Sequence, residues 1–154
     1  MKQTLITLMS LLMLGVSSLL QAEDLMMLRS TQPFPETMST LQNVIKQHGY
    51  VVSRVQRVDI GLTNMGYKTD KYRVVFFGKH EELEQLTDTY PELAAYLPLK
   101  IAIFSEETET LLVTTDPIKF SEMFPDEALK KHFKQWSEDT VSIFNQIRNT
   151  GDNE

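Results

Sequence analysis

Apolar residues along the chain fall into short runs and helix-spaced stripes, which predict a mixture of strands and helices. The runs rich in aliphatic and aromatic residues predict strands at about 25–29, 50–60, 72–77, 100–104 and 110–114. The strongest run begins at Tyr72 and ends at Gly78. The last two runs are separated only by the polar stretch 105–109, so we expect them to pair as a hairpin.

Three segments have the apolar spacing of an amphipathic helix. The first, about 35–48, begins with a proline that suits the first helical position, and Gly49 follows it as a stop signal. The second runs from about His80 to Thr89. The third, at about 126–148, would be about 35 Å long at 1.5 Å per residue. Its apolar stripe consists of Leu129, Phe133, Trp136, Thr140, Ile143 and Ile147.

Hairpin-linked strands mixed with helices predict the α+β class. We expect a mostly antiparallel sheet of about five strands, with helices packed on one face and a long C-terminal helix. No repeat, linker or low-complexity tract divides residues 23–154, which predicts a single domain. The C-terminal helix should cover the sheet, and Trp136, Val141 and Phe144 suggest self-association as a second use of the same helix.

The first 22 residues have a different character from the rest of the chain. Lys2 precedes an uncharged run from Thr4 to Leu20, and the small residue Ala22 stands just before the first acid. This order predicts a cleavable secretory signal peptide at 1–22. An uncleaved anchor is the alternative, but the run is shorter than the roughly 20 apolar residues that a spanning helix needs. We therefore expect an exported protein, periplasmic if the source has two membranes, with no stable membrane anchoring after cleavage.

Composition narrows the classes of function. Removal of residues 1–22 leaves 132 residues, with 14 lysines and arginines against 21 acids and a formal net charge of −7. A chain of this length can bury a core without disulfides, and it contains no cysteine. The excess of acid argues against nucleic acid and anionic membrane surfaces as partners. The lack of cysteine excludes thiol chemistry and lipid attachment at a cysteine.

Part of this pattern resembles a known family. A strand closing on Phe77-Gly78 leads to a helix, then to the string from Pro91 to Lys100, and a later strand closes on Asp116-Pro117. Together with the entry His48-Gly49-Tyr50, this resembles the domain of unknown function 302 family over residues 25–120. The segment Leu97-Pro98-Leu99-Lys100 is its most specific part.

The resemblance implies a compact α+β domain that tends to self-associate, and it brings no agreed activity. One departure follows Gly78: the chain has Lys79-His80, whereas family members usually carry Asn-Pro or a similar turn. A pocket shaped by that turn would differ here. The helix at 125–148 looks like an extension beyond the shared core.

Metal and cofactor motifs are absent from the sequence, and we expect neither a metal nor a cofactor. Each of the three histidines stands alone in its segment, without the spacing of a zinc site. A metal-handling protein stays open as a minor alternative, because His80 and Glu84 would share a helix face and thioethers of Met26 and Met27 suit copper(I).

Catalytic motifs are absent too. No serine has the G-x-S-x-G setting of a nucleophile elbow, and no glycine-rich phosphate loop precedes a helix. A small hydrolase or isomerase would therefore need an unconventional site. Such a site would use a histidine or carboxylate with a shifted pKa in a cleft, for example His80 or Glu106.

A ligand pocket is the remaining candidate. Four residues fall near strand ends in the segment that resembles the family, and His80 completes the candidate set: Phe77, His80, Tyr90, Tyr96 and Lys100. They predict an apolar pocket in which Lys100 meets an anionic group. The leading hypothesis is a non-enzymatic, exported, soluble module that binds a small molecule or another protein, with a second copy of itself as the expected protein partner.

Overall fold

The computed structural model describes residues 24–151, so the predicted signal peptide lies outside the described residues. This part of the chain contains a five-stranded antiparallel sheet in the order β1-β5-β4-β3-β2. The strands are β1 (Leu25–Ser30), β2 (Val51–Arg57), β3 (Tyr72–Gly78), β4 (Leu99–Ser105) and β5 (Thr110–Thr115). The α+β prediction is confirmed, and β4 and β5 pair as the expected hairpin.

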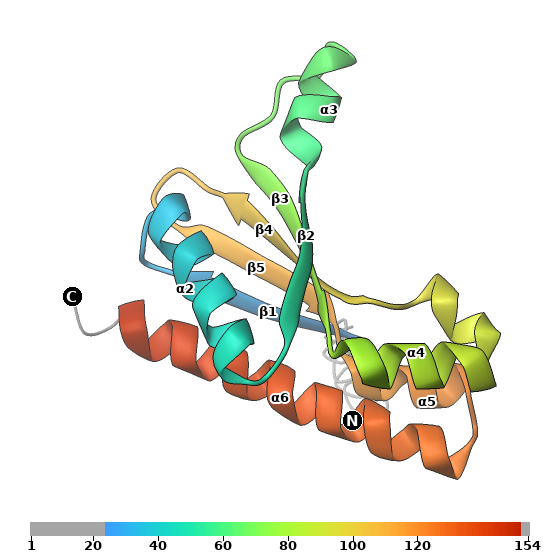
Figure 1. The fold of residues 1–154 in the computed structure, drawn as a ribbon. Helices are drawn as coiled ribbons and strands as arrows, with labels where there is room; N and C mark the ends of the chain where they lie inside the picture. The colour runs from blue at the N-terminus through green and yellow to red at the C-terminus, as the bar shows by residue number, and fades with distance from the viewer. Residues whose placement is uncertain (1–23, 152–154) are drawn as a thin grey trace, which may run out of the picture.

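The predicted helices are all present. Helices α2 (Phe34–Gln47) and α6 (Glu127–Gly151) lie on the same face of the sheet, while α4 (His80–Thr89) lies beyond one end of it (Figure 1). Next to α4 is a short 3-10 helix, η2 (Pro91–Ala95). No helix within residues 24–151 is long and apolar enough to cross a membrane.

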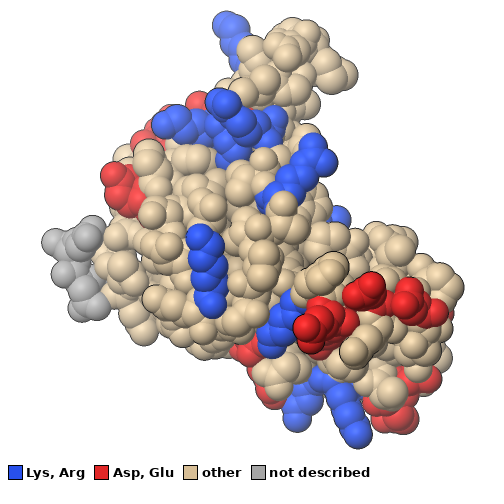
Figure 2. All heavy atoms as spheres, in the orientation of Figure 1, with Lys and Arg blue, Asp and Glu red and all other residues tan. Residues whose placement is uncertain are grey.

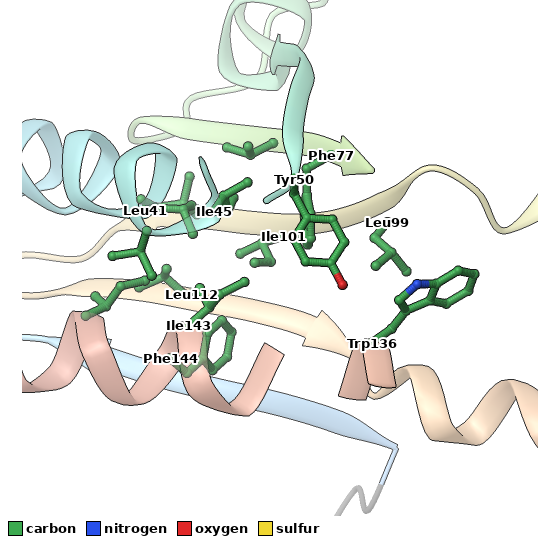
Figure 3. Packing of buried hydrophobic residues seen from close by; sticks show 14 of the residues in the cluster. Leu41, Ile45, Tyr50, Phe77, Leu99, Ile101, Leu112, Trp136, Ile143 and Phe144 are labelled. Carbon is green, nitrogen blue, oxygen red and sulfur yellow. The ribbon is translucent and has the colours of Figure 1, made fainter. Parts of the chain in front are cut away.

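The core fills the space between the sheet and the two helices that cover it. All six residues of the predicted α6 stripe are buried, with exposed fractions of 2% or less. They pack with aliphatic side chains of α2, β4 and β5, including Leu41, Ile45, Ile101 and Leu112, as Figure 3 shows. Long side chains at helical spacing therefore give α6 one continuous apolar contact with the sheet.

Two residues considered for contact with another copy belong to this core instead. Trp136 is 1% exposed and Phe144 is 5% exposed. Both side chains therefore belong to the buried face of α6, in agreement with the first expectation for this helix, and neither is available for contact with another copy. Val141, at 47% exposed, is the one of the three that faces solvent.

The predicted second strand is too long. β2 ends at Arg57, which pairs with Arg73, and the chain then forms helix α3 (Val58–Asn64). The side chain of Asp59, in the first turn of α3, forms an ion pair with Arg73. Helix α3 ends the β2–β3 hairpin and stands clear of the sheet in Figure 1. Valine and isoleucine at 58–60 are strand-like in type, but they have no partner on β3 beyond Arg73.

Two short elements after β5 were not predicted from the sequence. Asp116 accepts a hydrogen bond from the backbone N–H of Ile118 over 3.1 Å and opens η3 (Pro117–Lys119). Helix α5 (Phe120–Met123) follows directly. A capping aspartate followed by proline favours this local start, although the helical segment is too brief to show a periodic pattern.

Candidate functional site

The face of the sheet opposite α2 and α6 is left uncovered by both helices. Side chains alternate along a strand, so the neighbours of the buried residues on each strand point to this open face. The strand register places four of them in one line across the sheet, from β1 to β3: Met27, Val113, Ala102 and Val74. All four are apolar, which is unusual for a sheet surface in contact with water.

A hollow of about 320 Å³ lies on this open face. It is lined by residues of four strands: Leu25, Tyr72, Val74, Phe76, Lys100, Ala102, Val113, Thr114 and Thr115. Apolar side chains form most of the lining, and Lys100 is the charged residue among those that line it. Tyr72 at its edge stacks on Phe104, with ring centroids 4.1 Å apart. We refer to this feature as the sheet hollow.

A second, smaller hollow of about 80 Å³ adjoins the first. Lys100, Thr114 and Thr115 line both, so the two hollows meet at the start of β4 and the end of β5. The far wall of the smaller hollow is aromatic, because Tyr96 packs against Phe120 with ring centroids 5.5 Å apart. The cis peptide bond between Leu97 and Pro98 lies in the segment that joins this wall to β4.

The five residues predicted to form a pocket do not lie together. Tyr96 and Lys100 line the same small hollow. Phe77 is in the core, 2% exposed, with its ring 5.4 Å from the ring of Tyr50 in an edge-to-face contact. His80 is exposed at the first residue of α4. Phe77 precedes Gly78 at the end of β3, and the alternation of the strand turns its side chain inward.

Tyr90 lines a different hollow, of about 480 Å³, beside α4, α5 and the start of α6. We call this the acidic hollow, because Glu92 and Asp126 lie in its lining together with Met123, Phe124, Pro125 and Leu129. Burial and the charge of Asp126 raise the pKa of Tyr90. Hydrogen bonds from the backbone N–H groups of Leu129 and Ala128 lower the pKa of Asp126, whose carboxylate caps α6.

A polar cluster between α4 and α6 was not predicted. One carboxylate, Glu82, accepts a hydrogen bond from Trp136 Nε1 over 3.3 Å and lies 2.7 Å from His132 Nδ1. Close by, the hydroxyl of Tyr50 donates to Asp139 over 2.6 Å, and Lys79 Nζ lies 4.6 Å from the Tyr50 ring centroid. None of these residues lines a hollow described above. The cluster joins α4 and the turn between α2 and β2 to α6, which is a structural role.

The residues suggested for an unconventional enzyme site and for metal handling do not form a common site. Glu106, in the β4–β5 loop, accepts a hydrogen bond from Arg29 Nε over 3.1 Å. Met26 packs against the core, whereas Met27 is 51% exposed on the open face. Within residues 24–151, no three histidine, aspartate or glutamate side chains come together as a metal would require.

A family model described as "Domain of unknown function DUF302" matches residues 26–147. The chain belongs to the DUF302 family. The crystal structure of an uncharacterized conserved protein DUF302 from Bacillus stearothermophilus is similar to this DUF302 chain, with a TM-score of 0.74 and 18% sequence identity. The superposition covers 82% of this chain and 99% of the other.

At 18% identity, this likeness shows a common fold and nothing further about activity. No curated protein matches this DUF302 chain. The matched residues continue into α6 as far as Ile147, and they include Lys100 and both hollows around it apart from Leu25.

Proposed function

We propose that this DUF302 protein is a binding module for a small amphipathic anion. The ligand lies with its apolar part in the sheet hollow and with its carboxylate or phosphate against Lys100. The observation that carries the proposal is the position of Lys100, whose side chain stands where the two hollows meet.

The lining of the sheet hollow favours an apolar ligand body. Val74, Phe76, Ala102 and Val113 come from three adjacent strands and leave an apolar surface that water contacts. Covering such a surface gains about 25 cal/mol per Å² of apolar area removed from water. A pocket with mostly apolar walls and a few polar groups is the usual form of a small-molecule site.

The charge of Lys100 favours an anionic group. Among the described residues, no carboxylate forms an ion pair with Lys100. Its ammonium group is a compact charge on a flexible four-carbon stem, which allows it to reach a ligand in either hollow. Thr114 fixes the local backbone by donating a hydrogen bond to the Lys100 carbonyl over 2.6 Å.

Isothermal titration calorimetry with decanoate and with decanol tests this proposal, since the two share a chain and differ in charge. We expect decanoate to bind the purified protein more tightly than decanol does. Lys100→Met should weaken decanoate binding by about two- to fivefold, the loss of one exposed ion pair, and leave decanol unchanged. Lys131→Met, at an exposed position of α6, is the matched control. Equal effects of the two substitutions, or no binding of decanoate, would overturn the proposal.

Export is part of the same proposal, and it is supported by the order of charge, apolar run and small residue at 1–22. Intact mass of the protein purified from its source should correspond to a chain that begins close to Glu23. The protein should also appear in the exported fraction of the cells. An intact mass that includes Met1 and the apolar run would contradict export by cleavage.

A further inference from the structure

The hairpin of β2 and β3 ends in an arm, residues 58–70, which begins with α3. No residue of α3 is buried. Three large apolar side chains of the arm are exposed: Ile60 at 40%, Met65 at 72% and Tyr67 at 59%. Figure 1 shows α3 projecting away from the sheet and the other helices. Apolar side chains gathered on a projecting element are typical of a surface that contacts a partner.

The arm is nevertheless a defined structure rather than a loose loop. Gly66, with φ of 87°, follows the last helical turn and adopts the left-handed conformation that glycine favours. The N–H of Gly66 bonds to the carbonyl of Thr63, and the N–H of Tyr67 bonds to that of Leu62. These two bonds form a Schellman motif. A seven-residue helix is too short to be stable alone in water, so this cap and the Asp59–Arg73 ion pair hold the arm in place.

The part of the molecule that carries the arm is basic, and the opposite end, which contains α4, is acidic. Residues 51–78, which include the arm, contain five lysines and arginines and two acids, a net charge of +3. The basic charge lies mainly on β2 and β3 at the base of the arm, because the arm itself contains one lysine, Lys68, and two acids. Residues 79–98, which include α4, contain one lysine and five acids, a net charge of −4. Figure 2 shows basic side chains gathered below the arm and acidic side chains over the end that contains α4. The two ends are therefore electrostatically complementary.

The acidic hollow and the arm have matching chemistry. It combines apolar walls, including Met123 at 49% exposed, with the carboxylates of Glu92 and Asp126. The arm combines exposed Met65 and Tyr67 with the exposed Lys68. Helix α3 lies at the opposite end of the molecule from α4 and α5 in Figure 1. The acidic hollow is lined by residues next to α4 and in α5, so one copy cannot fill its own hollow.

We infer that the arm of one copy docks in the acidic hollow of a second copy. Apolar residues at the arm tip enter the hollow, and Lys68 faces the carboxylates at its rim. Reciprocal docking closes a dimer, and one-way docking forms a chain of copies. This inference does not depend on ligand binding at the sheet hollow.

Crosslinking tests the contact directly, because the chain has no cysteine of its own. Two single variants, Met65→Cys and Met123→Cys, are prepared separately and then oxidised alone or as a mixture. We expect the mixture to give a disulfide-linked pair of the two different variants in excess over pairs of like variants. Pairs formed only between like variants would overturn the assignment.

The association constant gives an independent test by analytical ultracentrifugation. Met65→Glu should weaken self-association of the protein by about tenfold or more, since it places a charge in an apolar contact beside two carboxylates. Met27→Glu, on the open face of the sheet, is the matched control and should leave self-association unchanged. Circular dichroism confirms that each variant is folded. A monomer at all concentrations, or a larger effect of Met27→Glu, would overturn the inference.

Charge reversal completes the test. Lys68→Glu and Glu92→Lys should each weaken association, and a mixture of the two variants should recover it. Higher salt should also weaken association of the unaltered protein, because the pairing charges are exposed. Failure of the mixture to associate better than either variant alone would contradict the pairing of these two surfaces.

Discussion

The hydroxyl of Tyr50 donates a hydrogen bond to Asp139 Oδ2 over 2.6 Å, which joins the residue before β2 to the middle of α6. Tyr50 is only 3% exposed. We predict that Tyr50→Phe lowers the free energy of unfolding by about 1.5–3 kcal/mol at neutral pH, the usual contribution of a hydrogen bond to a charged group. Denaturant unfolding followed by circular dichroism measures this change. Tyr67→Phe, at an exposed position of the arm, should have no effect on stability.

The same contact predicts a pH dependence. Burial, the hydrogen bond to Asp139 and the charge of Asp139 raise the pKa of Tyr50. A raised folded-state pKa stabilises the protein fully below the unfolded value of about 10, and this stabilisation is lost as pH rises through the folded pKa. Stability of the unaltered protein should thus fall more steeply above about pH 10 than that of Tyr50→Phe. Parallel curves for the two proteins would contradict this origin of the pKa shift.

Periodicity in the sequence was sufficient to predict the buried face of α6, because a helical stripe is a local property of one element. The six α6 residues at helical spacing all prove to be buried. The Tyr50–Asp139 contact was not predictable, since 89 residues separate its partners and neither residue has a distinctive neighbourhood in the chain. The packing of α2, which ends just before Tyr50, against α6 brings the two together.

In the candidate site too, local patterns indicate some contacts, whereas contacts between residues distant in the sequence could not be predicted. Tyr96 and Lys100 line the same small hollow, and a local pattern could suggest this because only three residues separate them, on either side of the turn into β4. Tyr72 and Thr115 were missed, although they line the same sheet hollow as Lys100. Their proximity depends on the register of β3, β4 and β5, which no local pattern specifies.

Trp136 reports on the contact between α4 and α6, because it is the single tryptophan of the chain. Its indole N–H donates to Glu82 of α4 over 3.3 Å, and it is 1% exposed. We predict that Glu82→Ala lowers the free energy of unfolding by about 1–2 kcal/mol, because a buried donor loses its partner. Acrylamide should also quench the tryptophan fluorescence of this variant more efficiently. Glu84→Ala, an exposed residue of the same helix, should change neither quantity.

Leu112 and Val113 are adjacent in β5 and point to opposite faces of the sheet. Leu112 is 0% exposed in the core, whereas Val113 lines the sheet hollow. We predict that Leu112→Ser lowers the free energy of unfolding by about 3 kcal/mol or more, through the cavity and the buried hydroxyl that it creates. Val113→Ser should lower it by about 1 kcal/mol or less. Equal losses in urea unfolding would mean that the open face is covered within the molecule.

The junction of β3 and α4 offers a test of close packing. A Cβ atom added to Gly78 would lie 2.3 Å from Leu83 Cδ1, a distance at which the leucine side chain must move. We predict that Gly78→Ala lowers the free energy of unfolding by about 1 kcal/mol, the low end of the usual effect of overpacking, because Leu83 is only partly buried and its side chain can move. Gly61→Ala is the matched control, since nothing lies within 4 Å of its added Cβ and it is in a helix. That substitution should raise stability by about 0.5–1 kcal/mol.

A double-mutant cycle with Leu83→Ala identifies the cause of the loss at Gly78. Leu83→Ala removes the atom that the new Cβ would meet, so Gly78→Ala should be less destabilising in its presence than in the unaltered protein. The loss of unfolding free energy in the double variant should therefore be smaller than the sum of the losses in the two single variants. If the two substitutions were simply additive, the loss at Gly78 would have to come from the backbone of β3. In that case the close approach to α4 would not be what excludes a side chain at this position.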